Sequence, residues 1–182
     1  MPGSNTRKPA KGRDPVPPRA ASSAQPRSRR WQIDIANRQP QPIPRRWIHR
    51  AVENTLASSK FSTAEISIAV VGDAEMQRLN RSYLQHDYPT DVLSFPLHRD
   101  VRSGQLAGEI IVSLPTARRT ARTLGWAPRW ELLLYVVHGT LHLVGHDDKT
   151  RAAQHRMRAA EAAVFRALQL PPPPSGESEE TE

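Results

Sequence analysis

Residues 135–148, which read YVVHGTLHLVGHDD, decide how the rest of this 182-residue chain is interpreted. His138 and His142 are four residues apart in an apolar segment. That spacing puts two side chains on one face of a helix, about 5–6 Å apart at Cβ. Gly145 is expected to end the helix, because the left-handed conformation of a terminal residue costs least without a Cβ. The stretch therefore predicts a buried helix carrying two imidazoles, followed by a turn back toward them.

The turn carries three further candidate metal ligands, His146, Asp147 and Asp148. Three protein ligands and one open position are typical of a catalytic zinc ion. In metzincin-type zinc sites the third ligand lies ten residues after the first, and in this chain that position is Asp148. We therefore expect His138, His142 and Asp148 to bind the metal and to carry catalysis through it. His146 is the alternative third ligand.

The residue directly after the first histidine bears on which reactions a metal site here could catalyse. Metallopeptidases of this layout have a glutamate there as the general base. In this chain the position is Gly139, so the sequence disfavours proteolysis. A bound metal can still polarise a phosphoryl oxygen, which keeps phosphodiester cleavage open.

The charge of the chain is unevenly distributed. Residues 1–30 contain eight Lys or Arg and one Asp, residues 171–182 contain four Glu and no base, and the whole chain carries a net charge of +8. A basic protein with a still more basic arm suits a polyanion such as RNA or DNA, although many basic tails bind nothing specific. Within the domain, Arg118, Arg119 and Arg122 lie within about one helical turn. They could follow a phosphate backbone or simply form a solvated helix face.

Composition excludes several classes of protein. The chain has no cysteine, which excludes disulfides and thiolate metal sites. No apolar run is long enough for a transmembrane helix, and the basic N-terminus lacks the apolar segment of a secretory signal. We therefore expect a cytoplasmic protein without a membrane partner. No dinucleotide cofactor is expected either.

The pattern of apolar residues predicts one α+β domain between two disordered tails. We expect a basic, proline-rich tail at 1–30, the domain at 31–170 and an acidic tail at 171–182. The domain should contain a single mixed sheet of about four strands with packed helices, and the metal site on a central helix. Residues 96–106 are polar and predict a turn, and Asp73 is a candidate helix cap. The expected strands lie near 31–36, 64–71, 92–95 and 109–112, and the expected helices near 45–56, 73–83, 116–124, 128–144 and 151–170.

Three strings in the chain resemble the YbeY family of bacterial rRNA maturation factors. They are DYPTDVLSFP at 87–96, GEIIVS at 108–113 and HGTLHLVG at 138–145. The similarity runs in order from about Ile33 to Leu168. It implies a zinc-dependent, single-strand-specific endoribonuclease with one zinc ion per chain. It also implies a role in maturation of the small-subunit rRNA 3′ end and in ribosome quality control, with rRNA and the small subunit as partners.

The resemblance implies three zinc ligands, and at one of them this chain has a different residue from the family. His138 and His142 match the first two zinc ligands of the family, whose third is usually a histidine at the place of Asp148. His146 stands where the family usually has tyrosine. A carboxylate ligand adds negative charge, so a water molecule activated at this site should be less acidic than one beside three neutral imidazoles.

A second departure concerns RNA cleavage. Many members have an arginine implicated in cleavage at the position of Leu84, and Arg81, three residues earlier, is the candidate substitute. The resemblance therefore leaves an alternative to the nuclease. The chain could be a metal-dependent RNA-binding protein of ribosome assembly with little or no turnover.

Overall fold

A computed structural model describes residues 30–174 of the chain. Of the two predicted tails, only Arg30 and residues 171–174 fall within this part, and the rest of each tail lies outside the described residues. The elements are β1 (Arg30–Asn37), α1 (Arg45–Ala57), β2 (Thr63–Val71), α2 (Asp73–Leu84), β3 (Val92–Asp100), β4 (Gln105–Ser113), α3 (Leu114–Leu124), α4 (Pro128–Val144) and α5 (Arg151–Ala167). No helix in the described part is long and apolar enough to cross a bilayer.

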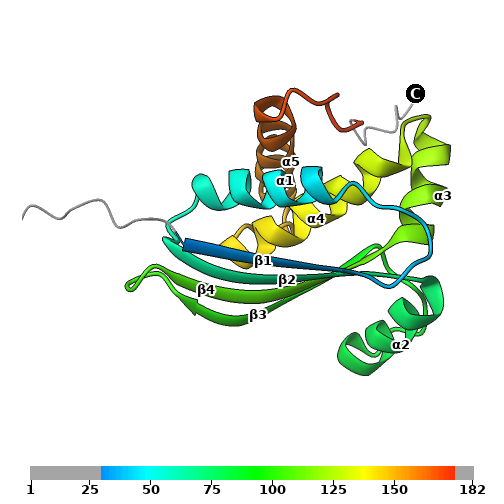
Figure 1. Ribbon diagram of the computed structural model, residues 1–182, viewed down its shortest axis with the longest axis horizontal. Helices are drawn as coiled ribbons and strands as arrows, with labels where there is room; N and C mark the ends of the chain where they lie inside the picture. Colours follow the sequence, from blue (N-terminus) through cyan, green and yellow to red (C-terminus); the bar gives the residue numbers. More distant parts are fainter. Residues whose placement is uncertain (1–29, 175–182) are drawn as a thin grey trace, which may run out of the picture.

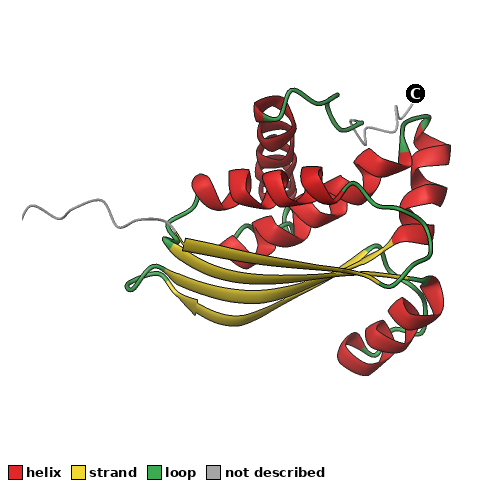
Figure 2. Cartoon of the chain, in the orientation of Figure 1, coloured by secondary structure: helices red, strands yellow, loops and turns green. Residues whose placement is uncertain are grey.

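The four strands form one mixed sheet, which confirms the predicted α+β class. The strand order is β1-β2-β4-β3; β1, β2 and β4 run parallel, and β3 is antiparallel to β4. Alternate residues of β2 (Ala64, Ile66, Ile68 and Val70) are buried, as expected when one face of a strand meets a core. Helices α1, α4 and α5 lie on that side of the sheet, and α2 lies beside the opposite side at one end (Figures 1 and 2).

Helix α4 is the central helix of the layer above the sheet. It packs against α1, α3 and α5 as well as β3 and β4, so apolar side chains cover most of its circumference. Leu132, Leu133 and Val136 are fully buried, and each such side chain contributes about 1.5–3 kcal/mol by leaving water. Gly145 ends the helix as predicted, in the left-handed region at a φ of 109°. The two candidate histidine ligands thus stand on a helix that is packed against three other helices and the sheet.

The sequence prediction for residues 96–106 was wrong. Strand β3 continues to Asp100 and β4 begins at Gln105, so only a short turn separates them. Pro96 is compatible with the longer strand because β3 is at the edge of the sheet, where a missing N–H donor is tolerated. The register shifts between Pro96 and His98, which accommodates the proline in the pairing with β4.

Asp73 does not cap α2 as expected. The cap position is Gly72, and Asp73 is the first residue of the helix. Its carboxylate instead accepts hydrogen bonds from the hydroxyls of Ser113 and Thr116, at 2.9 and 3.2 Å. Arg119 also binds this carboxylate, and its guanidinium holds the pKa of Asp73 below the ordinary value although partial burial acts in the other direction. Asp73 therefore ties α2 to the start of α3.

Candidate metal centre

Two histidines of α4 and one aspartate of the following turn converge at a single point. The Nε2 atoms of His138 and His142 are 2.9 Å apart, and Oδ2 of Asp148 lies 3.6 Å from each of them. All three candidate ligand atoms lie within 4.8 Å of one another. Ligands bound tetrahedrally at zinc distances are separated by about 3.3 Å. The spacing and the nitrogen and oxygen donors therefore fit one divalent cation.

The turn after α4 brings Asp148 back to the histidines. Nδ1 of His142 donates a hydrogen bond to the carbonyl oxygen of His146, at 3.1 Å, which leaves Nε2 facing the centre. Oδ1 of Asp147 accepts bonds from the backbone N–H groups of Asp148 and Lys149, at 2.9 and 3.3 Å. The carboxylate of Asp147 thus stabilises the turn that carries Asp148, and this structural role accounts for an aspartate next to the candidate ligand.

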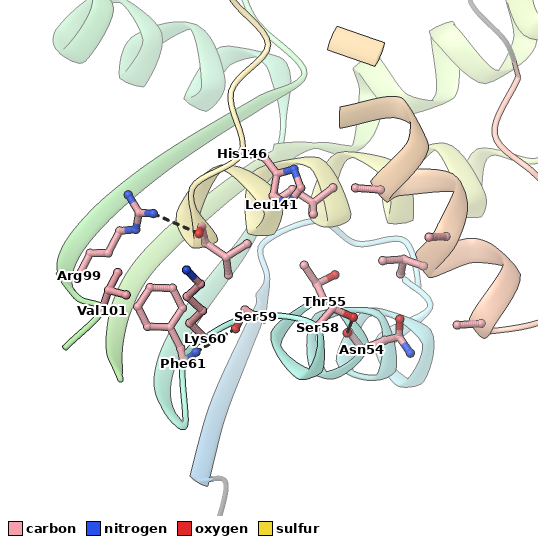
Figure 3. Close-up of a pocket in the computed structure, with 15 residues that line it drawn as sticks. Asn54, Thr55, Ser58, Ser59, Lys60, Phe61, Arg99, Val101, Leu141 and His146 are labelled. Atoms are coloured by element: carbon pink, nitrogen blue, oxygen red, sulfur yellow. Dashed lines mark hydrogen bonds between the residues drawn. The ribbon is translucent and has the colours of Figure 1, made fainter. Parts of the chain in front are cut away.

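The side chain of His146 lies elsewhere. It lines a second pocket at the end of α4, together with Leu141 (Figure 3). Among the hydrogen bonds of the described residues, His146 contacts the candidate metal centre through its backbone carbonyl, which accepts from His142. The geometry therefore supports Asp148 over His146 as the third ligand.

Glu161, on α5, binds and orients the first candidate ligand, His138. Nδ1 of His138 donates to Oε1 of Glu161 at 2.7 Å, and the glutamate is only 8% exposed. Burial alone would lower the pKa of His138, but the hydrogen bond and the charge of Glu161 outweigh it and raise this pKa. A carboxylate bound to Nδ1 fixes the imidazole with Nε2 toward the metal, the arrangement found behind many metal-binding histidines.

Sequence reasoning missed Glu161, although the sequence contains a signal for it. Residues 153, 157, 161 and 164 follow one face of α5, and three of them are the buried apolar residues Ala153, Met157 and Val164. Glu161 is the exception on this face. A carboxylate in an apolar stripe needs a buried partner, because an isolated buried charge is strongly unfavourable.

We expect substitution of Glu161 to weaken metal binding. Glu161→Ala removes both the charge and the acceptor, and zinc affinity should fall by roughly 10–100-fold. Glu161→Gln keeps an acceptor oxygen and should fall less. Competition with a chromophoric chelator measures the affinity, and Glu109→Gln, an exposed site on β4, is the matched control. Equal affinities for wild type and Glu161→Ala would contradict the role assigned to this residue.

Gly139 faces the sheet and is not among the residues that line the cleft beside His138 and His142. A Cβ at this position would lie 2.9 Å from Cγ2 of Ile110 and 3.2 Å from Cγ2 of Val92, closer than side chains normally approach. Glycine is therefore needed for α4 to approach the sheet at the level of the ligands. A glutamate here would be buried against these residues, so the position has no room for the general base of a peptidase.

The close contact at Gly139 should make this position sensitive to size. We expect Gly139→Val to lower the free energy of unfolding by about 1–3 kcal/mol, because α4 or the strands must move. Ala159→Val, on the exposed face of α5, measures the effect of valine on a helix without the clash. Chemical denaturation gives both values. A Gly139→Val protein no less stable than the Ala159→Val control would show that the helix is not held this closely.

His138, His142 and Asp148 line a cleft, the metal cleft, between α4, β3 and the end of α2. Its volume is about 420 Å³. Leu84, 51% exposed, forms one wall, at the position where the family resemblance predicts an arginine. Arg81 is not among the residues that line the cleft; its guanidinium lies 3.9 Å from the carboxylate of Asp87. No Lys or Arg of residues 30–174 lines the cleft.

The three arginines of α3 are separate from the cleft. Arg119 is bound to Asp73 at 2.5 Å and to Thr116 at 2.8 Å, which favours a structural role for it. Arg118 and Arg122 are exposed. RNA binding by these residues and by Arg81 stays a prediction from the sequence.

Known proteins are similar to this chain over most of its length. The model of the family described as Endoribonuclease YbeY matches residues 31–169. The Endoribonuclease YbeY of Rhodopirellula baltica is 41% identical over 116 residues, which are 63% of this chain and 59% of that protein. That of Syntrophotalea carbinolica is 38% identical over 139 residues, 73% of this chain and 93% of that protein. A solution structure from Thermotoga maritima is 23% identical with a TM-score of 0.53, covers 83% of this chain and 99% of its own, and shows the shared fold.

Proposed function

Because this chain belongs to the YbeY endoribonuclease family, we propose that it is a metal-dependent endoribonuclease that cuts single-stranded RNA. Its substrate is ribosomal RNA at the 3′ end of the small-subunit molecule, and it works on ribosomes in the cytoplasm, in maturation and quality control. The convergence of His138, His142 and Asp148 in an open cleft carries the proposal.

Zinc is the proposed metal. Two imidazole nitrogens and one carboxylate oxygen are a common donor set for catalytic zinc, and they leave a coordination position for the reaction. When bound, such an ion stabilises negative charge on a phosphoryl group and makes a nearby water molecule more acidic. His138, His142 and Asp148 would hold the ion, and Glu161 would keep the His138 ring in place.

The cleft walls define what the protein itself adds to this chemistry. Leu84 and the partly buried Phe95 present apolar surface beside the ligands, and Ser94 presents a hydroxyl group. Apolar walls can pack against the bases of an unpaired strand, whose faces are exposed only when the RNA is not in a duplex. Since no arginine or lysine of the described residues lines the cleft, a metal held by His138, His142 and Asp148 would supply most of the positive charge there.

The second candidate is a metal-dependent RNA-binding protein of ribosome assembly with little or no turnover. Leu84 is the observation that favours it, because this side chain cannot stabilise the charge that develops on a phosphate during cleavage. The two candidates make the same prediction for RNA retention and different predictions for strand scission.

A cleavage assay separates these functions. Purified full-length protein is incubated with end-labelled single-stranded RNA, the same RNA in a duplex, and casein, each with and without a chelator. Chelator-sensitive cutting of the single strand, restored by zinc, supports the nuclease. RNA binding without cutting supports the assembly protein, and casein digestion would overturn both. The product ends identify the nucleophile, because attack by the 2′-hydroxyl leaves a cyclic phosphate and attack by water does not.

A further inference from the structure

A second pocket lies at the end of α4, and its lining residues are different from those of the metal cleft. It has a volume of about 650 Å³ and lies between the C-terminal parts of α1, α4 and α5 and the far end of β3 (Figure 3). Leu141, Val144 and Val164 contribute apolar surface. Lys60, Arg99 and His146 line it as well, and none of its described lining residues is acidic. An apolar wall with a cationic rim suits a ligand that has both a flat apolar group and a phosphate.

Arg99 is held in place at the mouth of this pocket. Its Nη2 donates to the carbonyl oxygen of Val144 at 3.2 Å, at the end of α4 (Figure 3). The guanidinium lies directly over Gly145, where a Cβ would be only 1.9 Å from Nη2. No carboxylate of residues 30–174 lies within ion-pair distance of Arg99. The guanidinium is therefore oriented by the backbone and keeps donors for an anion.

The pocket and the metal centre share a wall. His146 lines the pocket with its side chain, and its carbonyl accepts the hydrogen bond from the metal-facing His142 at 3.1 Å. Strand β3 passes both sites, with Phe95 in the metal cleft and Arg99 in the pocket. A flexible polymer that has one phosphate at the metal can therefore reach the pocket by passing around the end of α4.

We propose that this pocket binds one nucleotide of the single-stranded RNA that flanks the scissile phosphate. The base lies on the apolar wall formed by α4 and α5, and Arg99 and Lys60 bind its phosphate. Asn54 and Ser58, at the end of α1, lie where they can bond the polar edge of the base. The inference rests on the proposed nuclease function, and it supplies the cationic contacts that the metal cleft lacks.

The first test removes charge from the pocket. Binding of a fluorescent single-stranded RNA to the full chain is followed by anisotropy in the presence of a chelator, so that no cutting occurs. Arg99→Ala and Lys60→Ala should each weaken binding by about tenfold and reduce the slope of log affinity against log salt by about 0.7. Arg102→Ala, in the turn of the same hairpin and outside the pocket, removes equal charge as the control.

The second test fills the pocket without changing any charge. Ala163 lines the pocket on α5, whereas Ala159 on the same helix is exposed and outside it. Ala163→Leu should weaken RNA binding by about tenfold, with Ala159→Leu equal to wild type. Thermal unfolding of all variants shows whether Arg99→Ala also loosens the end of α4, an effect that would leave the salt slope unchanged.

The outcomes of these tests distinguish failure of the nucleotide-site proposal from failure of the proposed nuclease function. If wild type cuts RNA and the pocket variants match their controls in affinity and salt slope, the nucleotide site is overturned and the nuclease stands. If Arg102→Ala loses as much affinity as Arg99→Ala, the attraction is general and the site is also overturned. If wild type never cuts RNA, the proposed function fails, while selective loss of RNA binding in Arg99→Ala and Ala163→Leu still supports the site.

Discussion

Replacing His142 by alanine is expected to reduce RNA cleavage by roughly a thousandfold while the protein stays folded. A metal centre supplies several kcal/mol of transition-state stabilisation, and about 4 kcal/mol corresponds to this factor. Nε2 of His142 lies among the candidate ligand atoms, 2.9 Å from that of His138, so its loss leaves two of the three candidate ligands. Cleavage of labelled single-stranded RNA and metal content after dialysis are the measurements.

The effect on folding should be small, which makes the result interpretable. The side chain of His142 is 28% exposed, and its hydrogen bond to the carbonyl oxygen of His146 joins it to a surface turn and not to the apolar core. His155→Ala, on the exposed face of α5, is the matched histidine control. Wild-type cleavage by a metal-free His142→Ala protein would show that the reaction does not use this centre.

The second large effect is expected at Asp148. Asp148→Ala should lower zinc affinity by more than about a hundredfold, beyond the loss that follows removal of a residue that only supports a ligand. The reason is that Oδ2 of Asp148 lies 3.6 Å from both imidazole nitrogens, within the candidate ligand group. Titration against a chelator of known affinity measures the change for the purified variants.

His146→Ala is the comparison that decides the third ligand. Its side chain lies in the second pocket, and the carbonyl that orients His142 is kept in the alanine variant. Zinc affinity should therefore change little. A larger loss for His146→Ala than for Asp148→Ala would mean that the turn rearranges on metal binding and that His146 is the third ligand.

These experiments, together with those on Glu161, test a centre assembled from three parts of the chain. Helix α4 provides two imidazoles, the turn after it provides a carboxylate, and α5 provides the acceptor behind His138. The supporting contact fixes one ring before any metal arrives, which reduces the entropy lost on binding. Affinity should therefore depend on the docking of α5 as well as on the ligands.

Local sequence patterns were sufficient to predict the helix that carries the two histidines and the strands beneath it. The four-residue spacing of His138 and His142 depends only on helix geometry, and the end of the helix depends on the conformational freedom of Gly145. Both predictions agree with α4 and its left-handed terminal residue. The four strands of the sheet were also predicted, because alternating or continuous apolar runs indicate strands whatever their partners are.

Contacts between elements were decided by the tertiary structure. The edge position of β3 allows residues 96–100, including Pro96, to extend the strand, and no local pattern indicates that position. Glu161 meets His138 across 23 positions of sequence, and the turn after α4 separates Asp148 from His146. Periodicity determines which face of a helix is apolar, but packing determines what that face meets. The sequence by itself therefore determined the two imidazoles and their helix, and the folded chain decided their partners.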